Sequence, residues 1–268
     1  MASMRSSNPV FTRMRSAPAP QDTTGWPPDQ RTGTPGAPTP EDLARGYRQP
    51  SGLTIDDVVV HTLGLFGLAG VGGAVGWLLV PGSPGVVMVA GIAGFVLSLV
   101  IGFSGRVTPP LVIAFAILAG IGAGGLSREY ESAYSGIIPQ ALLGTGVIFT
   151  TMLLAYRSRR IRATPRMARI VGSVLLAVVA LSLIDLVLRL TTDSHLPIMN
   201  DASVWGILFS LAVLVVASLQ FILDFDYIER AIAARAPRSE AWRASYGLLI
   251  GFLWVYLEML RLLSKLRR

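Results

Sequence analysis

The sequence contains no cysteine, two histidines and a single lysine, and each shortage excludes a kind of chemistry. Without cysteine the chain can form no disulfide and offers no thiolate to a substrate or a metal. The histidines, His61 and His195, are expected on opposite sides of the membrane-spanning helices described below, so they cannot form one metal site. The motifs His-Glu-x-x-His and Gly-x-Ser-x-Gly and the phosphate-binding loop are also absent. We therefore expect no enzyme activity, no catalytic residue and no cofactor.

Charged residues are scarce as well. They make up 15% of the chain, whereas hydrophobic residues make up 52% and the mean hydropathy is +0.57. A soluble domain of this size would carry about 25% charged residues. The composition therefore indicates a polytopic membrane protein whose main partner is the lipid bilayer. The net charge of +7 comes almost wholly from arginine, and no basic patch interleaves with aromatic residues, so nucleic acid is not an expected partner.

Residues 1–50 differ in composition from the rest of the chain. They hold nine of the seventeen prolines and little that could form a core, so we expect a disordered tail in the cytoplasm. Their basic start is not followed by an apolar stretch and a small-residue cleavage site, which argues against a signal peptide. The predicted organisation is a proline-rich tail over 1–50 and a transmembrane bundle over 51–268.

Seven apolar segments follow the tail, and each is close to the roughly 20 residues that a helix needs to cross the hydrocarbon core. Prolines mark the turns after the first two segments, and Ser127–Ser132 is predicted to be a charged loop after the third. The predicted fold class is therefore all-α, a bundle of seven transmembrane helices. The predicted spans are about 57–80, 85–104, 109–127, 136–156, 168–190, 203–224 and 246–264.

The distribution of arginine predicts the orientation of these spans. Six arginines occur between Arg157 and Arg169, and loops of this kind stay in the cytoplasm. Counting from this loop places the N-terminus, and also the loop from Arg230 to Arg243, on the cytoplasmic side of the cytoplasmic (inner) membrane. Seven spans then leave the basic segment Arg261–Arg268 outside, which conflicts with the rule. Either the internal loops dominate or the last segment does not fully cross, and we favour seven complete spans.

Glycine is dense in the first three spans. Ala69 and Gly73, like Gly120 and Gly124, have the spacing of two small residues separated by three others. Small residues at this spacing let membrane helices approach closely. We therefore interpret these glycines as packing positions rather than as the lining of a pathway.

Acidic residues inside the last two spans are the best indication of function. The sixth span runs into Asp224 and Asp226, and the seventh contains Glu258. An acid at the bilayer centre costs roughly 2.5–3.5 kcal/mol, so it seldom persists without a partner, water or a function. If Asp226 pairs with Arg230 one turn later, Asp224 points to nearly the opposite face and thus inward. On consecutive antiparallel spans, Asp224 and Glu258 could form one polar site, although Asp224 should lie several ångströms shallower.

Two carboxyl groups that met in this way would share a proton, because like charges in a low dielectric cannot both ionise easily. Such a site could sense pH or bind a cation. Oxygen ligands without sulfur or paired histidines suit H⁺ or Ca²⁺, which makes Asp224 and Glu258 a possible Ca²⁺ site. A further acid, Asp185, lies deep in the fifth span. It could form an ion pair with Arg189 one turn later, or it could line a cavity.

Several segments resemble the Bax inhibitor-1 family, in particular its actinobacterial branch. They are Arg5–Phe11, Glu131–Thr145, Phe149–Met152 with the arginine loop, Leu223–Ile228 and Trp254–Leu263. The resemblance covers about residues 55–268. It implies a seven-helix bundle in which the other six helices wrap around the last one. It also implies a pH-sensitive calcium leak through a pair of aspartates on the last two helices.

The resemblance suggests which residues would form that pair. The family pattern Asp-Thr-Gln-x-Ile in the sixth span falls on Asp224-Phe-Asp-Tyr-Ile228, so the first acid corresponds to Asp224 and the glutamine position holds Asp226. The second acid corresponds to Glu258, where an aspartate is usual. Two functions remain open from the sequence. One is a cation-leak channel gated by protonation of this site, and the other is a non-conducting scaffold or regulatory protein that binds a membrane protease or another membrane protein. The sequence does not indicate an oligomeric state.

Overall fold

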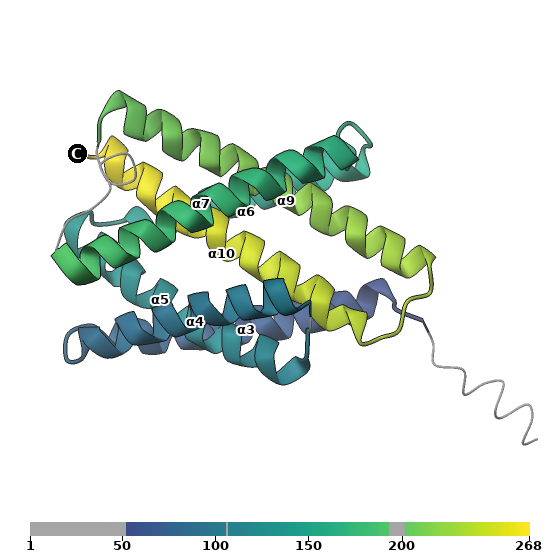
Figure 1. The fold of residues 1–268 in the computed structure, drawn as a ribbon, viewed down its shortest axis with the longest axis horizontal. Coiled ribbons are helices and arrows are strands. Elements are labelled where there is room, and N and C mark those ends of the chain that lie inside the picture. The colour runs from purple at the N-terminus through teal and green to yellow at the C-terminus, as the bar shows by residue number, and fades with distance from the viewer. Residues whose placement is uncertain (1–51, 106, 193–201) are drawn as a thin grey trace, which may run out of the picture. The chain divides into compact units, whose positions relative to one another are not determined.

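The computed structural model describes residues 52–105, 107–192 and 202–268, apart from the side chains of residues 189 and 190, and all its regular structure is helical. The predicted tail over 1–50 therefore lies outside the described residues. Each of the seven helices in the described residues is long and apolar enough to cross a membrane, which confirms the predicted fold class (Figure 1). The helices are α3 (Ile55–Leu79), α4 (Pro84–Ser104), α5 (Pro109–Ala133), α6 (Ile137–Arg157), α7 (Pro165–Thr192), α9 (Val204–Ala233) and α10 (Glu240–Leu266).

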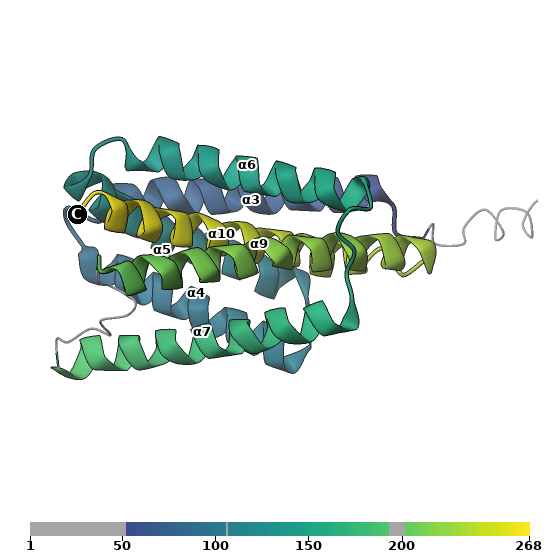
Figure 2. The same ribbon diagram turned by 90° about the horizontal axis from the view of Figure 1, so that it is seen from above.

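Helix α10 is the central element of the bundle, as the family resemblance implies. It packs against α3, α5, α6 and α9, and Figure 2 shows it between α9 and the pair α3 and α6. The expectation that all six other helices wrap around it is too broad. Helix α4 packs mainly against α5, and α7 mainly against α9, so these two lie at the outside.

The helix ends have local causes. At the start of α3, the Thr54 hydroxyl accepts a hydrogen bond from the Asp57 backbone N–H, and the Asp57 carboxylate accepts one from the Thr54 N–H, which is a capping box. Helices α4 and α5 have proline in their first turn, where its missing N–H costs nothing. Helix α4 ends at Gly105, whose φ of 64° lies in the left-handed region that glycine adopts without strain.

The predicted charged loop at Ser127–Ser132 is wrong, because α5 continues through it to Ala133. Glu131 explains the extension. Its carboxylate accepts hydrogen bonds from the backbone N–H groups of Gly136 (2.6 Å) and Ile138 (3.3 Å), which are the otherwise unpaired donors at the start of α6. The charged end of α5 therefore caps the next helix instead of forming an irregular loop.

The glycines of α3 and α5 form a backbone-to-backbone contact, as their spacing predicts. A Cβ atom on Gly120 would lie 2.3 Å from the carbonyl oxygen of Ala69, and one on Gly124 would lie 2.0 Å from that of Gly73. Real Cβ atoms do not come this close to another atom, so only glycine fits at these two positions. The same holds between α4 and α5, where a Cβ on Gly122 would lie 2.7 Å from the Cα atom of Gly91.

The basic C-terminus lies at the end of α6 opposite to the arginine loop, so α10 crosses the bundle completely. Arg267 donates hydrogen bonds to the carbonyl oxygen of Ser135 (2.9 Å) and to the side-chain oxygen of Gln140 (2.8 Å). Arg268 donates to the Tyr134 hydroxyl (3.1 Å). These residues belong to the connection between α5 and α6, at the start of α6. Helix α10 is thus long enough for a seventh full span, as we favoured, and its last arginines are bound to the protein itself.

Candidate functional site

Asp224 lies in the interface between α9 and α10, over a gap made by two glycines. A Cβ atom on Gly247 would lie 3.1 Å from its Oδ1 atom, and one on Gly251 would lie 3.5 Å from its Oδ2 atom. Oδ1 accepts a hydrogen bond from the side-chain amide of Gln220 (3.0 Å), one turn earlier on α9. Oδ2 is buried and has no hydrogen-bond partner among the described residues. The two glycines thus make room for a carboxyl group that is only partly satisfied.

The surroundings of Asp224 are apolar. Phe221 is fully buried and its ring is the nearest neighbour of a Cβ placed on Gly251, at 3.2 Å, while Phe225 is 8% exposed. No cation among the described residues compensates Asp224. Burying an ionised carboxylate without a partner is costly.

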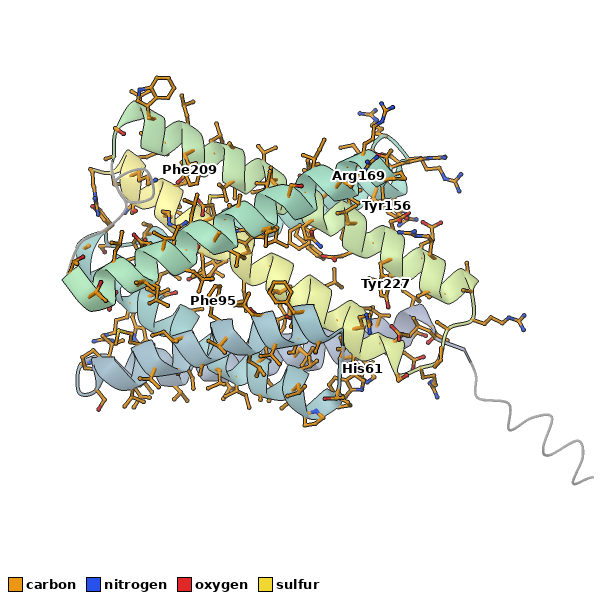
Figure 3. All side chains as sticks on the ribbon, viewed as in Figure 1. His61, Phe95, Tyr156, Arg169, Phe209 and Tyr227 are labelled. Carbon is orange, nitrogen blue, oxygen red and sulfur yellow. The ribbon has the colours of Figure 1, made fainter. Side chains whose placement is uncertain are left out.

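The acids at the end of α9 are bound to other side chains. Asp226 forms an ion pair with Arg230, one turn along the helix, as its spacing predicts. Glu229 accepts a hydrogen bond from the Tyr156 hydroxyl of α6. Asp226 therefore does not share the environment of Asp224, although only two residues separate them. Figure 3 labels Tyr156, Tyr227 and Arg169 at this end of the bundle.

Glu258 is more deeply buried than Asp224, with 1% of its surface exposed, and it has a different partner. Its Oε2 atom accepts a hydrogen bond from the guanidinium of Arg261 at 2.7 Å, whereas Oε1 has no partner among the described residues. The sequence contained the signal for this pair, because residues three apart on a helix share a face. The pair of Glu258 and Arg261 was nevertheless not among the predicted ones.

The structure does not bring the carboxyl groups of Asp224 and Glu258 together. Asp224 lies level with Gly247 and Gly251, and Glu258 follows Gly251 by seven residues, or about 10 Å along the helix at 1.5 Å per residue. The predicted offset of several ångströms was therefore too small. A shared proton and a joint Ca²⁺ site are therefore not supported by this geometry. Among the described residues, no three His, Asp or Glu side chains lie together as metal ligands would.

Asp185 is buried in α7, at 8% exposure. The side chain of Arg189 is not among those that the structure describes. The predicted ion pair between Asp185 and Arg189 therefore lies outside the described residues. Helix α7 packs against α9 and not extensively against α10, so Asp185 belongs to a different interface from Glu258.

Lys265 is an interior residue, which its position in the basic C-terminal segment did not predict. It is 3% exposed, and its ammonium group donates hydrogen bonds to the carbonyl oxygen of Gly206 (2.9 Å) and to the Ser210 hydroxyl (3.0 Å). Positions 251, 258 and 265 are seven apart on α10, and positions 210 and 224 are fourteen apart on α9, so each set follows one helix face. We call the set Ser210, Asp224, Glu258, Arg261 and Lys265 the polar stripe. It places polar groups at three depths along the α9–α10 interface.

Comparisons with known proteins identify the family. No curated protein and no solved structure matches the chain. The family model described as "Bax inhibitor 1 like" matches residues 8–268. The match begins well before residue 55, where the resemblance was expected to begin, so it includes most of the N-terminal segment. Because it covers nearly the whole chain, and because seven helices can span a membrane, this multi-pass membrane protein belongs to the Bax inhibitor 1 like family.

Proposed function

We propose that this protein conducts a slow, pH-dependent cation leak across the cytoplasmic membrane, with Asp224 as the group whose protonation controls it. The observation that carries the proposal is the buried Oδ2 atom of Asp224, which has no hydrogen-bond partner among the described residues and faces two glycines. An acid in such a position in a membrane helix is expensive and is usually functional. Oxygen ligands favour H⁺ and hard cations such as Ca²⁺.

The sign of the pH dependence follows from the packing. When Asp224 is neutral, its carboxyl group on α9 can pack directly against the glycines of α10 without water between the two helices. Ionised Asp224 needs water or a cation beside Gly247 and Gly251, which requires this contact to loosen. The leak should therefore increase as the pH rises. Glu258 is excluded from this role because Arg261 already neutralises it.

We also propose that the arginine-rich end faces the cytoplasm. The connections from α6 to α7 and from α9 to α10 both lie at this end and are both rich in arginine, as expected for loops that remain inside. The native chain has no cysteine, so Arg160→Cys and Arg235→Cys each introduce a single labelling site. A membrane-impermeant maleimide should label both sites in inverted vesicles and neither in intact cells. Labelling of either site in intact cells would reverse the orientation.

The test of the leak uses the purified full chain in liposomes that contain a calcium-sensitive dye, with a pH-sensitive dye in a second preparation. Flux is measured at one acidic and one alkaline pH. We expect greater flux at alkaline pH, and we expect Asp224→Asn to remain at the low, acidic level at both. If the folded wild-type protein produces no flux at either pH, the non-conducting scaffold function is favoured instead.

A further inference from the structure

An apolar cleft lies between α3 and α6, and none of its lining residues belongs to the polar stripe. Its volume is about 630 Å³, and α3, α6, α9 and α10 all contribute to its lining. Val58, Phe225 and Leu248 form a floor in which each residue is less than 9% exposed. On the sides, Leu63 of α3 is 68% exposed and Leu153 of α6 is 40% exposed. The cleft therefore opens outward between α3 and α6, where the lipid of the bilayer would surround the protein.

The lining offers contact to an apolar chain and almost nothing to a polar ligand. Aromatic rings pack edge to face around it, with Phe66 against Phe252 at 4.9 Å and Phe149 against Phe225 at 5.7 Å between ring centres. Only three lining residues carry polar side chains. Thr62 donates its hydroxyl hydrogen to Ser245, while Tyr156 and Glu229 are bonded to each other, so these groups already have partners.

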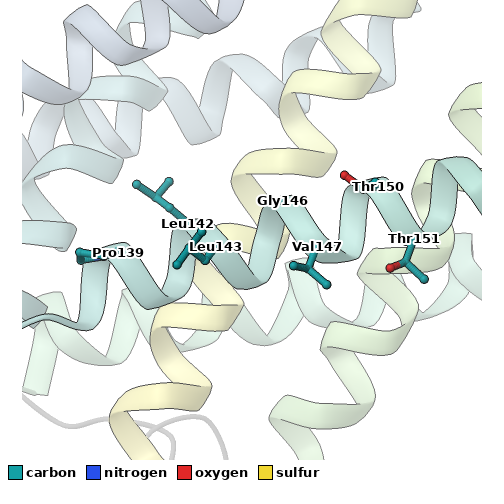
Figure 4. Close-up of a pocket in the computed structure, with 7 residues that line it drawn as sticks. All are labelled: Pro139, Leu142, Leu143, Gly146, Val147, Thr150 and Thr151. Carbon is teal, nitrogen blue, oxygen red and sulfur yellow. The ribbon is translucent and has the colours of Figure 1, made fainter.

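This cleft differs from the hollow on the outer face of α6. That hollow is larger, at about 750 Å³, but all its lining residues belong to α6, as Figure 4 shows. It therefore has one wall, and a lipid chain lying there would exchange freely with its neighbours. The cleft has walls from several helices and a buried floor, so a chain inside it is enclosed on more than one side.

Positive charge lies beside one end of the cleft. Tyr156 of the lining is followed directly by Arg157, and Arg159 and Arg160 lie in the connection that follows α6. From the other side, the backbone of Arg235 lies against Gly52, just before α3; a Cβ on Gly52 would be 3.1 Å from the Arg235 Cα atom.

These four arginines are exposed, and none has an ion-pair partner among the described residues. By contrast, Arg230 and Arg238 in the same region are paired with Asp226 and Asp57. One carboxylate, Glu229, lies in the lining at this end, so the balance of charge remains positive. Clusters of arginine next to membrane helices attract anionic lipid headgroups.

We propose that the cleft binds one acyl chain of an anionic phospholipid, with the lipid phosphate held by Arg235, by Arg157 at the end of α6 and by the arginines that follow it. The lipid would come from the leaflet on the arginine-rich side. This inference does not depend on the leak, because it concerns other residues and its readout is lipid binding.

Native mass spectrometry of the purified full chain in detergent tests this proposal. Phosphatidylglycerol is the anionic probe and phosphatidylcholine the zwitterionic one. We expect one lipid per chain, with phosphatidylglycerol bound at least about tenfold more tightly, since tenfold corresponds to about 1.4 kcal/mol and two basic residues near a lipid surface contribute about 1 kcal/mol each. Arg157→Gln combined with Arg235→Gln should remove most of that preference without abolishing binding. An unchanged preference in this double variant would overturn the assignment of the phosphate site.

A matched pair of variants tests the cleft itself. Leu153→Trp fills it, whereas Leu154→Trp places the same ring on the neighbouring residue, which is 59% exposed and does not line the cleft. We expect at least a tenfold loss of phosphatidylglycerol binding in the first variant and none in the second. Leu63→Trp, with Val60→Trp as its control, repeats the comparison from α3 in case Leu153→Trp does not fold. Equal binding in both members of each pair would show that the lipid lies elsewhere.

Discussion

Helices α3, α4 and α5 pack in a different way from helices α6, α9 and α10. In the first group, glycine brings the backbones into direct contact, with no space for a single added methyl group at Gly120 or Gly124. In the second group, large rings such as Phe149, Phe221 and Phe225 keep the helices apart. The difference shows which part of the molecule can accommodate a ligand or a change in packing. The unpaired carboxyl oxygens belong to the second group, and the apolar cleft lies between that group and α3, whereas the contacts among α3, α4 and α5 leave no such space.

The largest effect is expected when the glycine contact is disturbed. In Gly124→Ala the new Cβ would lie 2.0 Å from the Gly73 carbonyl oxygen, and because both partners are backbone the helices must separate. We expect a loss of at least about 3 kcal/mol of unfolding free energy, the upper end for overpacking. Thermal unfolding in detergent is the measurement.

Gly70→Ala is the control for this substitution, because nothing lies within 4 Å of the added Cβ. It should leave stability unchanged or raise it slightly, since alanine has the higher helix propensity. Similar melting temperatures for Gly124→Ala and Gly70→Ala would contradict the view that α3 and α5 meet through their backbones.

A smaller effect is expected in the second region, at the ion pair of Glu258 and Arg261. Arg261→Gln leaves a buried carboxylate without its cation, and breaking a buried pair in this way is strongly destabilising. The Arg261 side chain is 29% exposed, so water screens part of the loss and we expect about 2 kcal/mol. Adding Glu258→Gln should recover most of the stability, because the two residues act together. If the double variant is as unstable as the two single losses combined, the pair does not exist.

The smallest effect is expected from Arg238, which binds Asp57 of the capping box at the surface. The Asp57 carboxylate raises the pKa of Arg238, so the arginine remains charged throughout the accessible pH range. Arg238→Gln should lower the melting temperature only slightly, and the loss should disappear in high salt, because exposed pairs are screened. A large and salt-independent loss would mean that this connection supports the fold.

The contacts among α3, α4 and α5 could be predicted from the sequence better than those among α6, α9 and α10. The glycine contact was predictable because its signal is local: the residues that meet are small and four apart on each helix. The helices themselves follow from apolar runs between prolines and glycines. The residues at which the helices begin and end were harder to predict. Charged residues continue α5 to Ala133, and the amphipathic turn Glu240–Tyr246 begins α10 before its apolar run.

The pairing of Asp224 with Glu258 was predicted wrongly because apolar runs do not give the register between two helices. Both α9 and α10 extend beyond their apolar runs, to Ala233 and back to Glu240, and the structure places Asp224 beside Gly247 and Gly251 instead. The cleft could not be predicted at all, since its lining comes from four helices and no single segment carries a pattern for it. Likewise, Lys265 belongs to a basic C-terminal segment in the sequence, and only the fold brings Gly206 and Ser210 beside it.

The most direct test of the central claim compares pH-dependent flux in liposomes for Asp224→Asn and Glu258→Gln, with Asp226→Asn as the control from the same turn of α9. Because Asp224 is compensated by no cation among the described residues and Glu258 is bound to Arg261, the two acids should behave differently. We predict that Asp224→Asn abolishes the pH dependence, whereas Glu258→Gln and Asp226→Asn retain it. Equal loss of pH dependence in Asp224→Asn and Glu258→Gln would contradict the account and would mean that the two carboxyl groups act as one site.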